Sequence, residues 1–301
     1  MAKNTCIIIV GPTAVGKTSL ALALARHFQT DIISADSRQC YSEISIGVAK
    51  PTPLQLNEVK HYFINSHSID ETVSAAAFEK YALAASNQIF ARNNIAILVG
   101  GTGLYVNAFC EGLDSIPSIH PEIRNDIRAS YELHGLKWLQ NAIQKNDPLY
   151  YSNGEMQNPQ RIMRALEVVL STGNSIRYYQ QGNKVIRDFN CIKIGLSLPK
   201  ELLHQNISHR VDIMLQEGLI DEVRQVVAYK NHNALQTVGY KEIFEYLDGQ
   251  SDLNSATEKI KTNTRHYAKR QLTWFKRDAQ IHWFAPGDLQ LILNYLATHL
   301  V

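Results

Sequence analysis

The sequence has 301 residues, of which 45% are hydrophobic and 19% charged, and its formal net charge is +2. This composition is typical of a folded globular protein, excludes a disordered chain, and gives no overall electrostatic sign of a nucleic-acid partner. The four cysteines are widely separated and form no CxxC pair, so the sequence predicts neither a zinc site nor a disulfide framework.

Strands and helices are predicted to alternate in the first hundred residues. The apolar run from Cys6 to Val10 predicts a buried strand, and it is too short for a signal peptide or a membrane span. We therefore expect a cytoplasmic protein without membrane association. A helix is predicted over 17–28, a short strand over 31–34, a helix over 75–93 and a strand over 95–100. This alternation favours an α/β fold with a parallel sheet covered on both faces.

The pattern changes near residue 112. Residues 116–144 and 158–173 have helical periodicity with no strand between them. A further strand is predicted over 191–198, followed by helices over 209–228, 239–249 and 257–278, the last of them basic. We expect the first part of a P-loop NTPase-like core over 1–112, a helical insertion domain over 113–188, and completion of the core with C-terminal basic helices over 189–301.

The segment GPTAVGKTSL at 11–20 has the form of a phosphate-binding loop. Its glycines allow backbone amides to converge on a diphosphate, Lys17 would reach the phosphate oxygens, and Thr18 would be a ligand of Mg²⁺. The alternative is a glycine-rich turn that only links a strand to a helix. The loop does not reveal whether a nucleoside triphosphate also binds. The predicted diphosphate-binding residues are Gly11, Pro12, Thr13, Ala14, Val15, Gly16, Lys17 and Thr18.

A carboxylate follows the second predicted strand. P-loop NTPases normally place an Asp after another apolar strand, but here the strand over 95–99 runs into GGTG and supplies none. Asp36, in SADSRQCY, is the remaining acid at a strand end, where the loops of a parallel sheet face the ligand. It is a candidate general base. The alternatives are a turn or cap residue, and the base for an acceptor hydroxyl in a small kinase.

Seven segments of the sequence form one further pattern. In chain order they are GPTAVGKT, SADSRQCY, GVAKPT, LVGGTGLY, NPQRIMRALEV, VGYKE and AKRQLTWFKR. Together they resemble the tRNA dimethylallyltransferases, also called tRNA isopentenyltransferases, of the IPP transferase family. That family usually has Thr at the position of Val48 and a hydrophobic residue at that of Arg38, and these departures leave the proposed base and phosphate groups intact.

This resemblance implies transfer of a dimethylallyl group from dimethylallyl diphosphate to N6 of an adenine next to the anticodon of tRNA. The loop amides, Lys17 and a Mg²⁺ at Thr18 would stabilise the departing diphosphate, and Asp36 would take the proton of the amine. Thr102 would lie near the reaction centre. The alternative for its GGTG segment is a plain tight turn.

The resemblance also implies contacts with the tRNA anticodon stem-loop. Between Lys259 and Arg277 the chain has seven Lys or Arg and no acid, which predicts a row of phosphate contacts that includes Lys261 and Arg265. The alternative is a solvated basic face of a helix, and for Arg124 a solvated helix charge. We expect a monomer. The predicted tRNA-binding residues are Asp36, Ser37, Arg38, Gln39, Thr102, Arg124, Gln160, Arg161, Ile162, Met163, Arg164, Lys269 and Arg270.

Three other functions remain open at this point. A small-molecule or nucleotide kinase would use the same loop for ATP and Asp36 for a hydroxyl. A non-catalytic RNA-binding protein would keep the loop as a relic. An enzyme that prenylates free AMP or ADP would need no RNA-binding surface.

Overall fold

The computed structural model describes residues 4–182 and 184–300, and the chain divides into two compact units. Unit 1 combines Met1–Glu111 with Ile186–Val301, and unit 2 is Gly112–Val185. Unit 2 covers nearly the same residues as the helical insertion expected over 113–188. Whether it binds RNA stays a prediction.

Unit 1 is built on a parallel sheet, which confirms the α/β fold. All neighbouring strands pair in parallel, and β1 lies between β4 and β5, with Cys6 opposite both Ala96 and Cys191. Two edge strands of two and three residues, β3 and β6, are too short to be predicted from periodicity. Within the described residues the order is β3-β2-β4-β1-β5-β6, with β1 Thr5–Val10, β2 Ile32–Ser34, β3 His61–Tyr62, β4 Ile95–Val99, β5 Asn190–Leu196 and β6 His282–Phe284.

The central strand β1 is buried on both faces. Cys6, Ile8 and Val10 pack into one hydrophobic core, and the alternating residues Ile7 and Ile9 pack into another. Side chains of a strand alternate between the two faces of the sheet, so an unbroken apolar run is what such a position requires.

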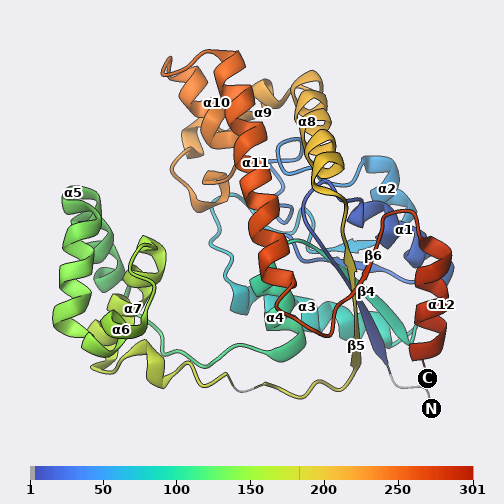
Figure 1. The fold of residues 1–301 in the computed structure, drawn as a ribbon, viewed down its shortest axis with the longest axis horizontal. Helices are drawn as coiled ribbons and strands as arrows, with labels where there is room; N and C mark the ends of the chain where they lie inside the picture. The colour runs from blue at the N-terminus through green and yellow to red at the C-terminus, as the bar shows by residue number, and fades with distance from the viewer. Residues whose placement is uncertain (1–3, 183, 301) are drawn as a thin grey trace. The chain divides into compact units, whose positions relative to one another are not determined.

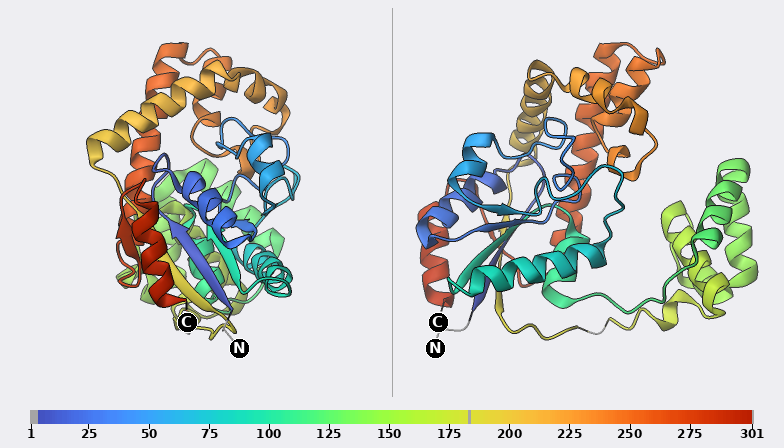
Figure 2. Two further views of the ribbon diagram at one scale, coloured as in Figure 1. Left: turned by 90° about the vertical axis from the view of Figure 1, so that its right-hand side faces the viewer. Right: turned by 180° about the vertical axis from the view of Figure 1, so that it is seen from behind.

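Helices cover both faces of this sheet (Figures 1 and 2). On one side α1 (Lys17–Phe28) and α12 (Leu289–His299) contribute to the core of Ile7 and Ile9. On the other side α3 (Ala75–Phe90) and α4 (Gly103–Glu111) contribute to the core of Ile8. The remaining α-helices described in unit 1 are α2 Pro53–Glu58, α8 Lys200–Gln216, α9 Leu219–Gln225, α10 Tyr240–Leu247 and α11 Leu253–Phe275.

The helices α8, α9 and α10 lie beyond the carboxyl edge of the sheet, with α11 running down from them (Figure 1). The sequence predicted one helix over 209–228, but the structure has two, because Gly218 has a φ of 99° and separates α8 from α9. Helix α8 also begins earlier than predicted, at Lys200. Its first half therefore carries residues that the sequence analysis did not place on a helix.

Unit 2 has its own hydrophobic core, formed by residues such as Leu139, Ile143 and Leu166. Gly135, at φ 70° and ψ −167°, interrupts the first of its helices, where the sequence predicted an unbroken one. Among the described residues, no helix of either unit is both long and apolar enough to span a membrane. The α-helices described in unit 2 are α5 Pro121–Asn146, α6 Pro148–Asn153 and α7 Pro159–Thr172.

Candidate active site

The predicted phosphate loop connects β1 to α1, as the motif requires. Gly11 and Gly16 have φ angles of 145° and 99°, which side-chain-bearing residues rarely adopt. A Cβ at Gly11 would lie 2.6 Å from the carbonyl oxygen of Leu196, so the close approach of β5 also requires a glycine there. The first turn of α1 then brings free backbone amides and the positive end of the helix to this loop.

Lys17 begins α1 and lines a cavity beside the loop. Its Nζ donates a hydrogen bond of 2.7 Å to the carbonyl oxygen of Pro12. Burial, and to a lesser extent the nearby charge of Arg210, together lower the pKa of Lys17 to about 7, with the charge of Asp36 partly opposing both effects. An anion entering this cavity would therefore favour the protonated lysine.

Gln271 of α11 joins the phosphate loop to the GGTG turn. Its Oε1 accepts a hydrogen bond from the backbone N of Thr13 at 2.8 Å, and its Nε2 donates to the carbonyl oxygen of Gly101 at 3.0 Å. The side chain is almost fully buried. The bond to Gly101 is therefore shielded from competing water, and the bond to Thr13 is partly shielded.

Helix α8 contacts the loop from another side. Asn206 donates to the carbonyl oxygen of Ala14 at 3.2 Å, and Arg210, one turn later, donates to Thr13 Oγ1 at 3.3 Å. Burial lowers the pKa of Arg210, and the charge of Asp36 partly offsets this. The sequence analysis missed Asn206, Arg210 and Gln271. The i, i+4 spacing of Asn206 and Arg210 was the available signal for two of them.

Asp36 lies in the loop after β2 and closes a tight turn. Its Oδ1 accepts hydrogen bonds from the backbone N of Arg38 at 2.9 Å and of Gln39 at 3.3 Å. Among the described residues, both hydrogen bonds to this carboxylate use Oδ1. Asp36 can therefore serve both as a turn residue and as a positioned acid.

The loop of Asp36 and the GGTG turn are held together. Thr102 Oγ1 accepts from the backbone N of Ser37 at 3.1 Å and donates to Ser37 Oγ at 3.4 Å. The backbone N of Thr102 donates to the carbonyl oxygen of Ala35 at 3.2 Å. A Cβ at Gly100 would overlap Ala35, so the close packing of the two loops depends on that glycine.

Two cavities meet at Asp36. The smaller has a volume of about 130 Å³ and is lined by the phosphate loop, including Lys17 and Thr18. The larger has a volume of about 440 Å³, extends toward α8, α10 and α11, and is lined by Ser37 and Arg38 among others. The residues that line both are Thr13, Asp36, Val48, Ala49, Arg210 and Tyr267.

Tyr267 of α11 is another such residue that the sequence analysis did not assign to the site. The side chain as a whole is 36% exposed, but desolvation of its hydroxyl, together with the charge of Asp36, raises the pKa of that hydroxyl to about 12. The guanidinium of Arg270 lies 5.8 Å from the centre of its ring. Arg270 lines the larger cavity and, like Lys269, is exposed.

The row of basic residues expected on α11 divides into two parts. Lys261 pairs with Asp212 at 3.0 Å and with Glu258 at 3.1 Å, and Arg265 donates to Ser208 at 2.9 Å. These two side chains thus also make contacts within unit 1, and whether they contact phosphates stays a prediction. The exposed pair Lys269 and Arg270 stays a predicted phosphate contact.

In unit 2 the predicted tRNA-binding residues differ in exposure. Ile162 and Met163 are buried in the core of this unit and belong to the apolar face of α7, so their side chains serve packing, and a role for these residues in RNA binding stays a prediction. The contacts proposed for the others stay predictions. Arg124 and Arg164 both pair with Glu167, at 3.2 and 3.1 Å, Arg161 pairs with Glu155 at 2.5 Å, and Gln160 is exposed.

The sequence matches one family model and many related proteins over most of its length. The family model described as IPP transferase matches residues 39–278. The tRNA dimethylallyltransferase 1 of Bacteroides thetaiotaomicron is 45% identical over 292 residues, which are 97% of this chain and 95% of that protein.

Solved structures agree with the sequence comparison. The full-length tRNA isopentenylpyrophosphate transferase of Bacillus halodurans is 36% identical, covers 99% of this chain and 97% of its own, and has a TM-score of 0.73. A eukaryotic dimethylallyltransferase acting on tRNA is 27% identical, with a TM-score of 0.77 over 93% of this chain and 73% of its own.

Proposed function

This chain belongs to the IPP transferase family, and from that membership we propose which part of the reaction takes place in each of its two cavities. The protein is a prenyltransferase that transfers a dimethylallyl group to tRNA. We assign the donor diphosphate to the smaller cavity and the meeting point of donor and acceptor to the larger one. The observation that carries this assignment is the place of Asp36, which lines both.

The smaller cavity is suited to a leaving diphosphate. The loop amides, the protonated form of Lys17 and the guanidinium of Arg210 are fixed donors around it. As the bond between C1 of the dimethylallyl group and the diphosphate oxygen breaks, negative charge grows on that oxygen. Donors that are already in place stabilise this charge without reorganisation, and each is worth about 10²–10³ in rate.

Asp36 is the proposed general base. The attacking group is N6 of an adenine next to the anticodon, whose lone pair is delocalised into the ring. The new bond joins N6 to C1, and the amine then loses one proton, which Asp36 accepts. Because the turn holds Oδ1, the carboxylate is oriented before the substrate arrives.

The residues of the smaller cavity fit a Mg²⁺ ion that is shared with the substrate. Thr18 and Ser34 offer hydroxyl oxygens there beside Asp36. Among the described residues, no group of three or more His, Cys, Asp or Glu could hold a metal alone. This agrees with an ion that relies on substrate phosphates and water for most of its ligands. Bound at Thr18, it would neutralise charge on the diphosphate.

The adenine has to leave the stacked anticodon loop to reach Asp36, at a cost of a few kcal/mol. We propose that phosphate contacts from Lys269 and Arg270, with contributions from Arg124, Gln160, Arg161 and Arg164 of unit 2, offset this cost. The exposure of Lys269, Arg270 and Gln160 supports this. We place the reaction in the cytoplasm, where unmodified tRNA is available.

A single incubation tests this function. The protein is mixed with labelled dimethylallyl diphosphate, Mg²⁺ and an unmodified tRNA anticodon stem-loop, with ATP and AMP in parallel reactions. We expect the RNA to gain one five-carbon unit on adenosine, seen by mass spectrometry, with release of diphosphate. Label that appears on AMP faster than on RNA, or ADP formed with a phosphorylated small molecule, would contradict the proposal.

A further inference from the structure

Glu222 of α9 lies outside both cavities, yet its carboxylate is the centre of a dense set of hydrogen bonds. Its Oε2 accepts from the backbone N of Ser45 at 2.7 Å and of Ile46 at 2.8 Å, and its Oε1 accepts from the backbone N of Gly47 at 2.9 Å. Three consecutive amides thus converge on one carboxylate that comes from a distant part of the chain. Hydrogen bonds to a charged acceptor are about twice as strong as neutral ones.

Tyr240 of α10 completes this arrangement. Its hydroxyl donates to Glu222 Oε1 at 2.6 Å, and its ring is fully buried. Burial raises the pKa of this hydroxyl, and the neighbouring Glu222 raises it further, so the hydroxyl stays a donor. The ring packs so closely on Gly47 that a Cβ there would lie 2.6 Å from it. The segment 45–47 is therefore held both by its amides and by packing.

The next residues of this segment form a wall of the site. Ala49 N donates to the carbonyl oxygen of Ile46 at 3.0 Å, and Lys50 N donates to that of Ser45 at 3.1 Å. This closes a turn in which Ala49 has a φ of 49°, a conformation that costs energy for a residue with a side chain. Val48 and Ala49, at the tip of the turn, line both cavities.

Gln39 connects this turn to the proposed base. Its Nε2 donates to the carbonyl oxygens of Val48 at 3.2 Å and Ala49 at 3.1 Å, and its own backbone N donates to Asp36 Oδ1. A continuous path of hydrogen bonds therefore runs from Glu222 through the turn and Gln39 to Asp36. Each step joins groups that would otherwise move independently.

We propose that Glu222 is a positioning residue for prenyl transfer, which holds the 45–49 turn as a cavity wall and, through Gln39, keeps Asp36 oriented toward the acceptor amine. The inference rests on the proposed function, because it concerns the orientation of the same base. We expect Glu222 to affect the rate of the chemical step rather than the affinity for diphosphate, because Gln271 and Arg210 hold the phosphate loop separately.

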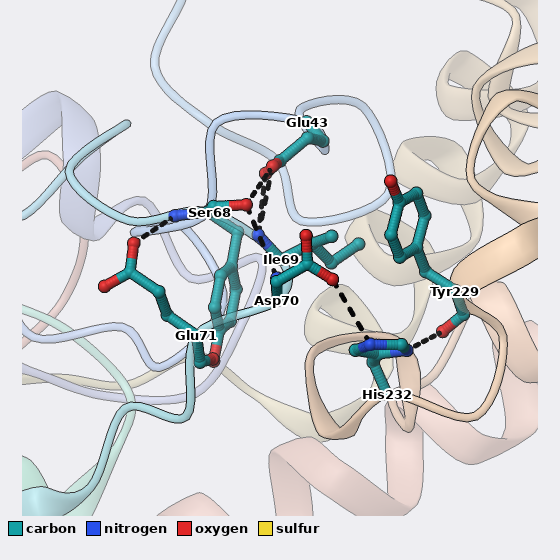
Figure 3. Close-up of polar contacts among 8 residues, drawn as sticks. Glu43, Ser68, Ile69, Asp70, Glu71, Tyr229 and His232 are labelled. Carbon is teal, nitrogen blue, oxygen red and sulfur yellow. Dashed lines mark hydrogen bonds and ion pairs between the residues drawn. The ribbon is translucent and has the colours of Figure 1, made fainter.

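The same loop offers a matched control. Glu43 also anchors it through its carboxylate, which accepts from Ser68 Oγ at 2.8 Å and from Ile69 N at 3.0 Å (Figure 3). The neighbouring Asp70 faces His232 across 3.3 Å, which brings this part of the chain against the segment between α9 and α10 (Figure 3). Glu43 thus stabilises the loop without taking part in the path from Glu222 to Gln39.

The experiment compares Glu222→Gln with Glu43→Gln in the full-length protein. Single-turnover transfer to tRNA, the KM values for donor and tRNA, inorganic pyrophosphate affinity and urea unfolding are measured for each. We expect Glu222→Gln to lower the transfer rate about 10- to 100-fold, because small misplacements of reacting groups cost that much. Pyrophosphate affinity should be unchanged, and Glu43→Gln should keep the wild-type rate.

A double-mutant cycle separates positioning from general stabilisation. If Glu222 acts through Gln39, the losses of rate from Glu222→Gln and Gln39→Ala should be clearly less than multiplicative when combined. Should Glu222→Gln fail to fold, Tyr240→Phe removes only one of the four bonds to the carboxylate and takes its place in the cycle.

The proposal is overturned if a folded Glu222→Gln or Tyr240→Phe protein transfers at the wild-type rate, if Glu43→Gln loses as much rate, or if the cycle is multiplicative. Failure of the proposed function is distinguishable from these outcomes, because it would appear as a wild-type protein that does not prenylate tRNA at all.

Discussion

Gln271 and Thr13 are 258 positions apart in the chain, and a hydrogen bond of 2.8 Å joins them. Because the same amide group also donates to Gly101, one buried side chain sets the distance between the phosphate loop and the GGTG turn. The site therefore depends on α11 as much as on the loop that the sequence motif identifies.

Replacing this amide should loosen both loops. Gln271→Met keeps most of the volume but leaves the Thr13 N–H and the Gly101 carbonyl without this partner. Each buried polar group left unsatisfied costs about 1–3 kcal/mol, so we expect a measurable loss in the free energy of unfolding in urea and weaker pyrophosphate binding. Thr273→Ala, at an exposed position of the same helix, is the control. Equal stability and pyrophosphate affinity in the Met variant and the wild type would contradict this role.

Asp36→Asn should separate the base from the turn. The side-chain oxygen of Asn can still accept the bonds from Arg38 and Gln39, so the fold and pyrophosphate affinity should remain. The transfer rate should fall by about 10²–10⁴, the usual contribution of a positioned general base. Rapid-quench kinetics with labelled donor measures this directly, and a folded variant with near wild-type turnover would remove Asp36 from the mechanism.

The low pKa of Lys17 predicts a pH dependence of diphosphate binding. Its charge is lost as the pH rises through about 7 in the empty enzyme, and the diphosphate prefers the charged form. Wild-type affinity for pyrophosphate, expressed relative to Lys17→Met, should therefore fall as the pH rises above about 7. The ratio cancels the titration of pyrophosphate itself. A ratio that does not vary with pH would show that Lys17 stays charged or takes no part.

The same shift has a consequence for folding stability. In the folded state Lys17 releases its proton near pH 7, whereas in the unfolded chain it does so near 10.5. The unfolded state therefore binds more protons between these values, and the free energy of unfolding due to this group rises with pH across that window. Comparing urea unfolding of the wild type and Lys17→Met at several pH values isolates the effect, and parallel curves for the two proteins would exclude it.

The exposed pair on α11 should carry the salt dependence of RNA binding. Lys269→Ala and Arg270→Ala should each weaken binding of the anticodon stem-loop, and each should reduce the slope of log K against log salt by about 0.7–0.9. Lys259→Ala is the control, because Lys259 pairs with Glu245 at 2.5 Å. Filter binding at several salt concentrations measures the slopes. Slopes that stay at the wild-type value in both variants would assign these residues to a merely solvated face.

The local patterns in the sequence predicted the parts of the protein whose structure is set locally. The apolar run of β1, the glycines of the phosphate loop and the helix that begins at Lys17 follow from residues that are neighbours in the chain. The sheet edges could not be predicted, because β3 and β6 are too short to show periodicity and depend on their partner strands.

The residues of the candidate site also divide into those that the sequence could predict and those that it could not. Lys17 and Asp36 follow strand ends and could be recognised. For Arg210 the available signal was its i, i+4 spacing from Asn206, whereas no local pattern identified Gln271, which reaches the site from α11, or Glu222, which holds a loop beside it. The burial of Ile162 and Met163 shows a limit of assigning residues from a motif. A segment can match a family motif as a whole while some of its side chains serve only the core.

The position of β1 between β4 and β5 has a consequence for synthesis of the protein. A ribosome completes the phosphate loop within the first twenty residues, but the second neighbour of β1 arrives only with Asn190 and the brace on the loop only with Gln271. The emerging chain therefore exposes an unpaired apolar strand edge during most of translation, a state that is prone to aggregation and suited to chaperone binding. A premature stop before Gln271 would leave the motif intact and the catalyst unassembled.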